Sequence, residues 1–354
     1  AVCALTDLTA LPDAQQQQQL SQREQAICGT EFNLASDLML RAELIQLQAN
    51  SFRLLLCLHH IAADGWSMDL LFAELSELYQ QLWRGQTVTE ANNGIQYLDY
   101  TVYLQQSEQQ KRLAEQQDYW CALLHDLPQV HHLPMDFTRP AEQTFTGSVV
   151  RGELSAQLFS DLQRFARQQQ CTVFVLLQTM LALTIARFSA ENDIVIGSPV
   201  ANRQRPETEA MLGLFVNSLL FRTRVDASAS LTQLLQQQQQ QAEQSFARQD
   251  LPFEQLVELL NPQRSLSYHP LFQIMLSMNS DFAVAMPNGA APAELSGLSL
   301  QPYEQEIVSL KFDLDIDVTE LNDGFEIKWT FDAVLFNRVY IETLQRHFTQ
   351  VLDS

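Results

Sequence analysis

The sequence predicts an α/β fold in which mixed sheets and helices are divided between two lobes of a 354-residue chain. Two apolar runs, residues 52–58 and 193–200, have the length of buried strands, and segments with helical spacing of apolar residues lie between them. A stretch at 126–147 contains three prolines and shows little periodicity, so we take it as the boundary. The expected lobes are residues 1–140 and residues 141–354.

The amino-acid composition and net charge exclude several classes of function. A hydrophobic content of 46% is ample for real cores, and a net charge of −21 argues against a nucleic-acid or anionic-membrane partner. We expect no membrane span, since no run of about 18 apolar residues occurs, and no signal peptide. The odd number of scattered cysteines fits a reducing cytoplasm: Cys3, Cys28, Cys57, Cys121 and Cys171. No metal site is expected, because none of these cysteines has the spacing of zinc ligands.

The first lobe is expected to begin with a glutamine-rich helix near residues 12–26, followed by paired strands at 38–47 and 52–58. Ser67 then opens a segment whose apolar residues have helix spacing. After a loop at 85–94, a long helical stretch is expected from Tyr97 to Leu124. The strand, polar turn and helix around Ser67 are the central feature of this lobe.

The second lobe is expected to open with a strand at 148–154 and two helices at 156–169 and 173–188, the latter apolar on most faces and therefore buried. Later elements are a strand at 271–278, a hairpin with its turn at 322–324, and an amphipathic helix at 336–352. The hairpin prediction rests on residues 312–318, where apolar side chains alternate with aspartates. The segment 282–302 is expected to be a long crossing loop.

The strand at 52–58 ends at His59 and His60, and Asp64 and Gly65 follow. This arrangement holds an imidazole at a strand end within reach of substrate, and histidine is the usual residue for moving a proton near neutral pH. The alternative is a pair of strand-end histidines whose hydrogen bonds are satisfied by the backbone.

The same His-His-x-x-x-Asp spacing recurs at His131, His132 and Asp136. That copy follows no strand, contains a proline and lacks the glycine. We interpret it as structural.

The stretch from His59 to Ser67 resembles the active-site motif of condensation domains of non-ribosomal peptide synthetases. Further stretches resemble this family in the same order, so the resemblance extends over most of the chain: 97–100, 193–206, 213–218, 248–254 and 264–273. The resemblance implies the chloramphenicol acetyltransferase-like fold, with two α/β lobes, a tunnel between them and a crossing segment that bridges the lobes.

Condensation domains normally carry an opening segment with an early helix motif and an arginine–histidine–glutamate stretch. Neither occurs in residues 1–58, so the first lobe is expected to be incomplete.

The implied reaction joins two substrates that carrier domains hold as thioesters on 4′-phosphopantetheine arms. The acceptor amine attacks the donor carbonyl and an amide forms. The implied partners are the donor and acceptor carrier domains and a neighbouring adenylation domain, and no cofactor of its own is expected. The run Arg264-Ser265-Leu266-Ser267 resembles family members that accept a D-configured donor.

The resemblance also implies roles for individual residues. His60 would orient the amine and take its proton, while His59 would pack or hydrogen-bond within the loop. Asp64 would pair with Arg203, and the Gly65 amide would help to stabilise the developing oxyanion. The residues expected at the tunnel are Trp66, Ser67, Asn217 and Asn279.

Two other functions stay open. An epimerisation domain shares the fold and the histidine motif, although Trp66-Ser67 fits condensation better. A non-catalytic member of the fold would only dock a carrier or recruit another enzyme, and such members are expected to have a degraded histidine motif.

Overall fold

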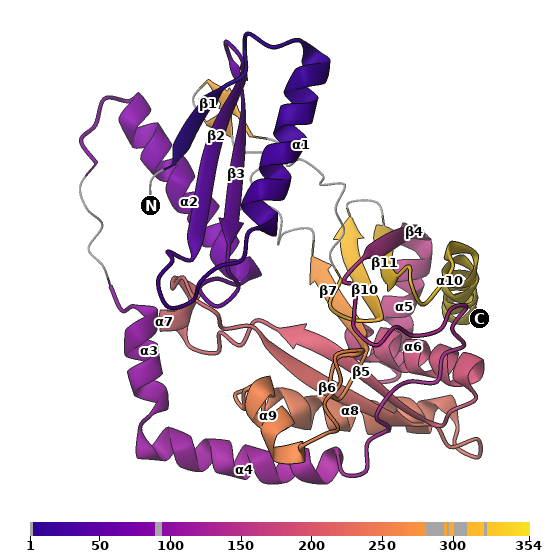
Figure 1. Ribbon diagram of the computed structural model, residues 1–354. Helices are drawn as coiled ribbons and strands as arrows, with labels where there is room; N and C mark the ends of the chain where they lie inside the picture. The colour runs from indigo at the N-terminus through magenta and orange to yellow at the C-terminus, as the bar shows by residue number, and fades with distance from the viewer. Residues whose placement is uncertain (1–2, 89–93, 281–293, 296, 301–309, 322–323) are drawn as a thin grey trace.

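A computed structural model describes residues 3–88, 94–280, 294–295, 297–300, 310–321 and 324–354. Its strands form a three-stranded sheet near the N-terminus and a six-stranded sheet in the rest of the chain, with a small third pair of strands (Figure 1). The two main sheets belong to two lobes, which confirms the predicted α/β class.

The first lobe is built on strands in the order β1-β2-β3: β1 (Ala4–Asp7), β2 (Leu40–Gln48) and β3 (Ser51–Leu58). β1 runs parallel to β2, and β2 is antiparallel to β3 as the sequence predicted. Two helices flank this sheet (Figure 1): α1 (Asp13–Gly29) and α2 (Gly65–Trp83). The described core of this lobe is small, with four buried apolar residues: Leu8, Leu20, Ile45 and Leu55.

The long helix expected from Tyr97 to Leu124 is interrupted. Two helices replace it, α3 (Tyr97–Leu104) and α4 (Ser107–Leu123), because Gln106 adopts an extended conformation with ψ of 143°. Both helices lie along the second lobe (Figure 1). Trp120 and Leu124 from the end of this stretch are buried in a core cluster with residues of the six-stranded sheet.

The six-stranded sheet has the order β4-β11-β10-β7-β5-β6. Its strands are β4 (Gly147–Ser155), β5 (Asp193–Val200), β6 (Asn217–Arg224), β7 (Ile274–Ser280), β10 (Leu314–Leu321) and β11 (Gly324–Asp332). β10 and β11 form the predicted antiparallel hairpin, although Asn322 and Asp323 of its turn lie outside the described residues. β7 begins later than expected and extends to Ser280, so Asn279 lies within the strand.

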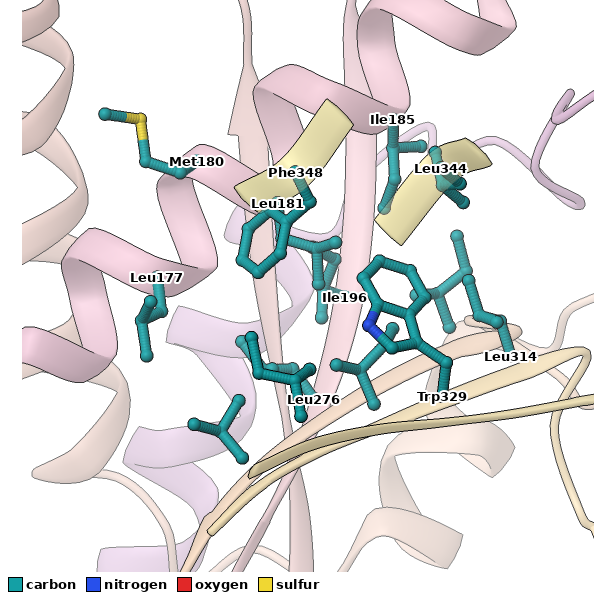
Figure 2. Close-up of a cluster of buried hydrophobic side chains, with 14 of the residues drawn as sticks. Leu177, Met180, Leu181, Ile185, Ile196, Leu276, Leu314, Trp329, Leu344 and Phe348 are labelled. Atoms are coloured by element: carbon teal, nitrogen blue, oxygen red, sulfur yellow. The ribbon is translucent and has the colours of Figure 1, made fainter. Parts of the chain in front are cut away.

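The remaining helices are α5 (Ala156–Gln168), α6 (Val173–Ser189), α7 (Pro206–Glu209), α8 (Leu231–Phe246), α9 (Phe253–Leu260) and α10 (Arg338–Asp353). α5, α6 and α10 pack on one face of the six-stranded sheet, where they meet the alternating apolar side chains of its strands. Figure 2 shows this core, with Trp329 of β11 beside Phe348 of α10 and Ile185 and Leu181 of α6. Asp313, Asp315 and Asp317 have the opposite alternation and therefore face away from it.

Most of the expected crossing segment, 282–302, lies outside the described residues. Its described part forms a short hairpin of β8 (Glu294–Leu295) and β9 (Leu298–Ser299). Gly297 of this hairpin lies near the ring of Trp83 in α2, so a segment between two second-lobe strands contacts the first lobe.

In the part of the chain that the structure describes, no single helix is long and apolar enough to cross a membrane, and only α5 and α6 together pass that test, with a 99° bend between them.

Candidate active site

The histidine motif lies where β3 gives way to α2. The His59 amide donates to the carbonyl of Met39, 3.0 Å away, and so continues the pairing with the segment before β2. The Ala62 amide then donates to the His59 carbonyl at 3.0 Å and turns the chain. Asp64 caps the N-terminus of α2, because its side chain accepts from the Ser67 amide. A strand end and a helix start therefore fix both ends of the loop.

The two histidines have different surroundings. His59 is half-buried; its Nδ1 accepts from the Ile61 amide at 3.1 Å, and its ring meets Phe32 edge-on. His60 is exposed, and within the described ranges its imidazole has no hydrogen-bond partner. Of the two rings, His60 is therefore the one that a substrate can reach.

Asp64 and Arg203 form a buried ion pair, although 139 residues separate them in the sequence. Both side chains are only 2% exposed, and Arg203 Nη2 lies 3.0 Å from Asp64 Oδ1. The other carboxylate oxygen accepts from the amides of Phe215 and Val216, at 3.0 and 3.2 Å. Asp64 thus joins the histidine loop of the first lobe to a loop that precedes β6.

The electrostatics of Asp64 follow from these contacts. Burial alone would raise its pKa, but the hydrogen bonds from Ser67 and Phe215 and the charge of Arg203 together hold the pKa below its usual range. The carboxylate is therefore charged at neutral pH, and it is saturated with donors. Such a group suits a structural role.

Arg203 has further contacts that hold its guanidinium in place. Nη1 donates to the carbonyls of Thr208 and Met211, and the guanidinium lies 4.1 Å from the ring centre of Phe215. Nη2 also donates to the Ser67 hydroxyl at 3.0 Å. A planar group with several donors can bind two lobes in this way, which a lysine could not.

Gly65 is the first residue of α2, where backbone amides have no intrahelical acceptor. A Cβ built on it would meet no atom within 4 Å, and its φ lies outside the left-handed region. Nothing in the described chain therefore requires glycine here by contact or conformation. The open space and the positive end of the helix dipole form a favourable place for a developing negative charge.

The four residues expected at the tunnel fall into two groups. Trp66 is 45% exposed, with its indole nitrogen donating to the Glu209 carbonyl at 2.9 Å, and Asn279 is exposed on β7. Ser67 and Asn217 are buried, and their side chains bond to backbone groups. Ser67 joins the lobes through Gly213, whereas Asn217 holds the segment 249–253.

Tyr97 is a positioning residue whose individual role the sequence did not reveal. Its hydroxyl donates to the Leu214 carbonyl at 2.8 Å, and its ring lies 5.1 Å from that of Phe215. The ring occupies the space that a Cβ on Gly213 would fill, at 2.1 Å. The tyrosine at the start of α3 therefore supports the loop that binds Asp64.

The second His-His-x-x-x-Asp copy has the structural role predicted for it. His131 Nε2 lies 2.8 Å from the fully buried carboxylate of Asp313, which Arg139 also binds. Asp136 accepts from Asn337 at the start of α10, and His132 lies at the surface beside Glu191. These residues tie the irregular segment between α4 and β4 to the second lobe.

A family model described as "Condensation domain" matches residues 2–354. The chain is 34% identical over 322 residues to tyrocidine synthase 3 of Brevibacillus parabrevis, covering 91% of this chain and 5% of that protein. It is 32% identical over 334 residues to malpinin synthetase of Mortierella alpina, covering 94% and 4%. The chain therefore spans a small part of these synthetases.

Two solved structures are similar in fold. The X-domain from teicoplanin biosynthesis superimposes with a TM-score of 0.86 at 25% identity, covering 99% of this chain and 77% of that one. The first condensation domain of the calcium-dependent antibiotic synthetase, bound to a substrate analogue, gives a TM-score of 0.68 at 20% identity, covering 99% and 74%.

Proposed function

Because the chain belongs to the condensation-domain family, we propose that it catalyses amide formation in a non-ribosomal peptide synthetase. The donor is an acyl or peptidyl thioester on one carrier domain, and the acceptor is the amine of an aminoacyl group on a second carrier. Both are held on 4′-phosphopantetheine arms, and an adenylation domain of the same synthetase neighbours the chain.

The observation that carries this proposal is the way in which the histidine loop is held and exposes His60. His60 is exposed beside the N-terminus of α2, and the Asp64–Arg203 pair holds the loop that presents it. The reactants need little further activation. A thioester is already activated, and an α-amino group with a pKa of about 7.7–8.0 is partly neutral at pH 7. Holding two tethered reactants together supplies most of the remaining gain.

Within this site, His60 orients the acceptor amine and takes its proton as the bond forms. The Gly65 amide, at the positive end of α2, stabilises the oxyanion of the tetrahedral intermediate. Trp66 and Asn279 lie at the tunnel that the substrates enter. The run 264–267 supports a D-configured donor, which paired assays with D- and L-terminated donors would test.

The test is a single-turnover assay of amide formation between two loaded carriers. His60→Ala is expected to lower the rate by about 10²-fold or more, the scale of a lost general base. His132→Ala provides a matched control, because it removes the corresponding histidine of the second motif copy and should leave the rate unchanged. Equal rates for wild type and His60→Ala would overturn the proposal.

A docking role is the second candidate, and the similarity to the X-domain favours it, since an X-domain has been solved in complex with OxyB. A docking domain would bind its partner without forming amide, and His60→Ala would leave that binding intact. An epimerisation domain would instead exchange the α-proton of a carrier-bound aminoacyl group, which deuterium incorporation measures.

A further inference from the structure

A cavity of about 290 Å³ lies between helices α3 and α4 and the segment 202–208, which leads into α7. One water molecule needs only about 10–15 Å³ of such space, so the cavity has room for an organic molecule. Neither His60 nor Gly65 lines it, so the cavity is separate from the candidate active site.

Two arginines and one aspartate supply the charges of this cavity. Arg112 Nη2 lies 2.7 Å from Asp250 Oδ2, and the same oxygen accepts from Gln116 at 2.9 Å. Among the described residues Arg205 has no carboxylate partner; its guanidinium lies 4.2 Å from the ring centre of Tyr103 and donates to the hydroxyl of that ring. The lining therefore has a net positive charge, although the net charge of the chain is −21.

The remaining lining offers apolar and amide groups. Leu113 is buried and Leu104 is half-buried, so both present apolar surface to the cavity. The side-chain amide of Gln109 can donate and accept, and within the described ranges it has no hydrogen-bond partner. A ligand that fits this lining combines an apolar group, a hydrogen-bonding group and a negative charge.

The carboxylate of Asp250 is already bound. Besides Arg112 and Gln116, Gln204 donates to it at 3.2 Å. The described lining therefore offers no free carboxylate to an ammonium group, which the nearby guanidinium groups would also repel. An amino acid whose nitrogen is acylated fits this cavity better than one with a free amine.

We propose that the cavity binds the carboxylate end of an N-acylated amino acid, supplied either by a free short peptide or by the C-terminus of a protein chain. The carboxylate binds Arg205, whose guanidinium has donors left beyond its bond to Tyr103. The peptide group bonds to Gln109, and an apolar side chain lies against Leu104 and Leu113.

Occupation of the cavity stabilises a segment that the candidate active site also uses. Arg203 lies between two lining residues, Asn202 and Gln204. Its Nη1 donates to the carbonyl of Thr208, which is a third lining residue. A ligand that restrains this segment therefore also restrains the arginine that pairs with Asp64, and it should raise the unfolding temperature.

The experiment titrates N-acetyl-L-leucine into the 354-residue chain and measures the heat of binding. Arg205→Gln should weaken binding by about tenfold or more, the scale of a lost hydrogen bond between charged groups. Arg167→Gln is the matched control, because Arg167 is an exposed arginine of α5 that bonds to the Gln163 carbonyl and does not line the cavity. This variant should bind like wild type.

Comparison of ligands needs no variant. N-acetyl-leucinamide lacks the carboxylate and leucine has a free amine, so both should bind more weakly than N-acetyl-L-leucine. A longer peptide that ends in leucine separates the two sources: a higher affinity assigns the site to a protein C-terminus, and an equal or lower affinity assigns it to free short acids.

The inference would be overturned if N-acetyl-L-leucine did not bind wild type, or if it bound a folded Arg205→Gln equally well. Equal binding of N-acetyl-leucinamide would overturn it too, since the carboxylate would then contribute nothing. None of these measurements depends on amide formation, so the inference and the proposed function fail separately.

Discussion

At the scale of single residues, Asp64 and Arg203 show how a motif residue can hold the histidine loop through a buried ion pair. Removing either one leaves the other buried and unpaired, which costs roughly 3–5 kcal/mol. Because the two side chains share one network, the unfolding free energies of Asp64→Ala and Arg203→Ala should not add in the double variant. Denaturant unfolding of the four proteins measures this, and simple additivity would show that the pair does not act as one unit.

Gly65, which we propose stabilises the oxyanion, and Gly213, which packs against Tyr97, offer a contrast between two glycines. A Cβ on Gly65 meets nothing, so Gly65→Ala should unfold like wild type. If the proposed role of Gly65 is right, the variant should form amide more slowly, because the methyl would enter the space proposed for the reacting carbonyl. A Cβ on Gly213 would collide with the Tyr97 ring, so Gly213→Ala should lower the unfolding free energy by about 1–3 kcal/mol. Unfolding curves and single-turnover rates for both variants test this, and an unimpaired rate in Gly65→Ala would remove Gly65 from the mechanism.

Asp315 predicts a pH dependence of stability. Burial, with the nearby charge of Asp317, raises its pKa from 3.8 to about 7, against the opposing charge of Lys328. Between these two values the folded state keeps a proton that the unfolded state has lost, so this group destabilises the fold progressively as the pH rises. Asp315→Asn should therefore be more stable than wild type at pH 8, by about 1.4 kcal/mol for each unit of the pKa difference, with the gain vanishing near pH 4.

The matched control is Asp226→Asn. Asp226 is exposed, and hydrogen bonds from Ser228 lower its pKa, so its amide variant should give no gain at pH 8. Thermal unfolding from pH 4 to pH 8 compares the variants. A pH-independent difference between wild type and Asp315→Asn would contradict the assignment.

At the scale of elements, α10 shows how the apolar spacing of one helix holds the second lobe together. Phe348 is fully buried against Trp329, with ring centres 5.8 Å apart (Figure 2). Phe348→Ala should lower the unfolding free energy by about 3–5 kcal/mol. Val339 of the same helix is 69% exposed, so Val339→Ala should change it by less than about 0.5 kcal/mol. Equal losses would mean that the helix packs through another face.

The elements also show which parts of the fold the sequence can predict. Alternation in β10 and apolar spacing in α10 are local patterns, so both elements were predictable within a few residues. The break at Gln106 was not, since glutamine is a fair helix former and no proline or glycine marks the turn. The contacts of Asp64 with Arg203 and of Tyr97 with Gly213 each join residues more than 100 positions apart in the sequence. The periodicity of apolar residues predicts local structure and cannot predict such contacts. Only the family resemblance suggested the first of them.

At the scale of the whole molecule, the two lobes differ in how well they cover apolar surface. In the described residues the first lobe buries a small core, yet it exposes large side chains, including Leu38 at 67% and Leu82 and Trp83 at 63% each. β3 pairs with β2 alone, so its other edge has no partner strand in the described sheet. Exposed apolar groups beside an open strand edge favour association.

The 354-residue chain is therefore expected to associate through its first lobe. Leu82→Gln should reduce association measured by sedimentation over a concentration series. Val339→Gln, on the second lobe and 69% exposed, should leave it unchanged. Equal association of Leu82→Gln and wild type would mean that this exposed surface has no part in the contact between copies.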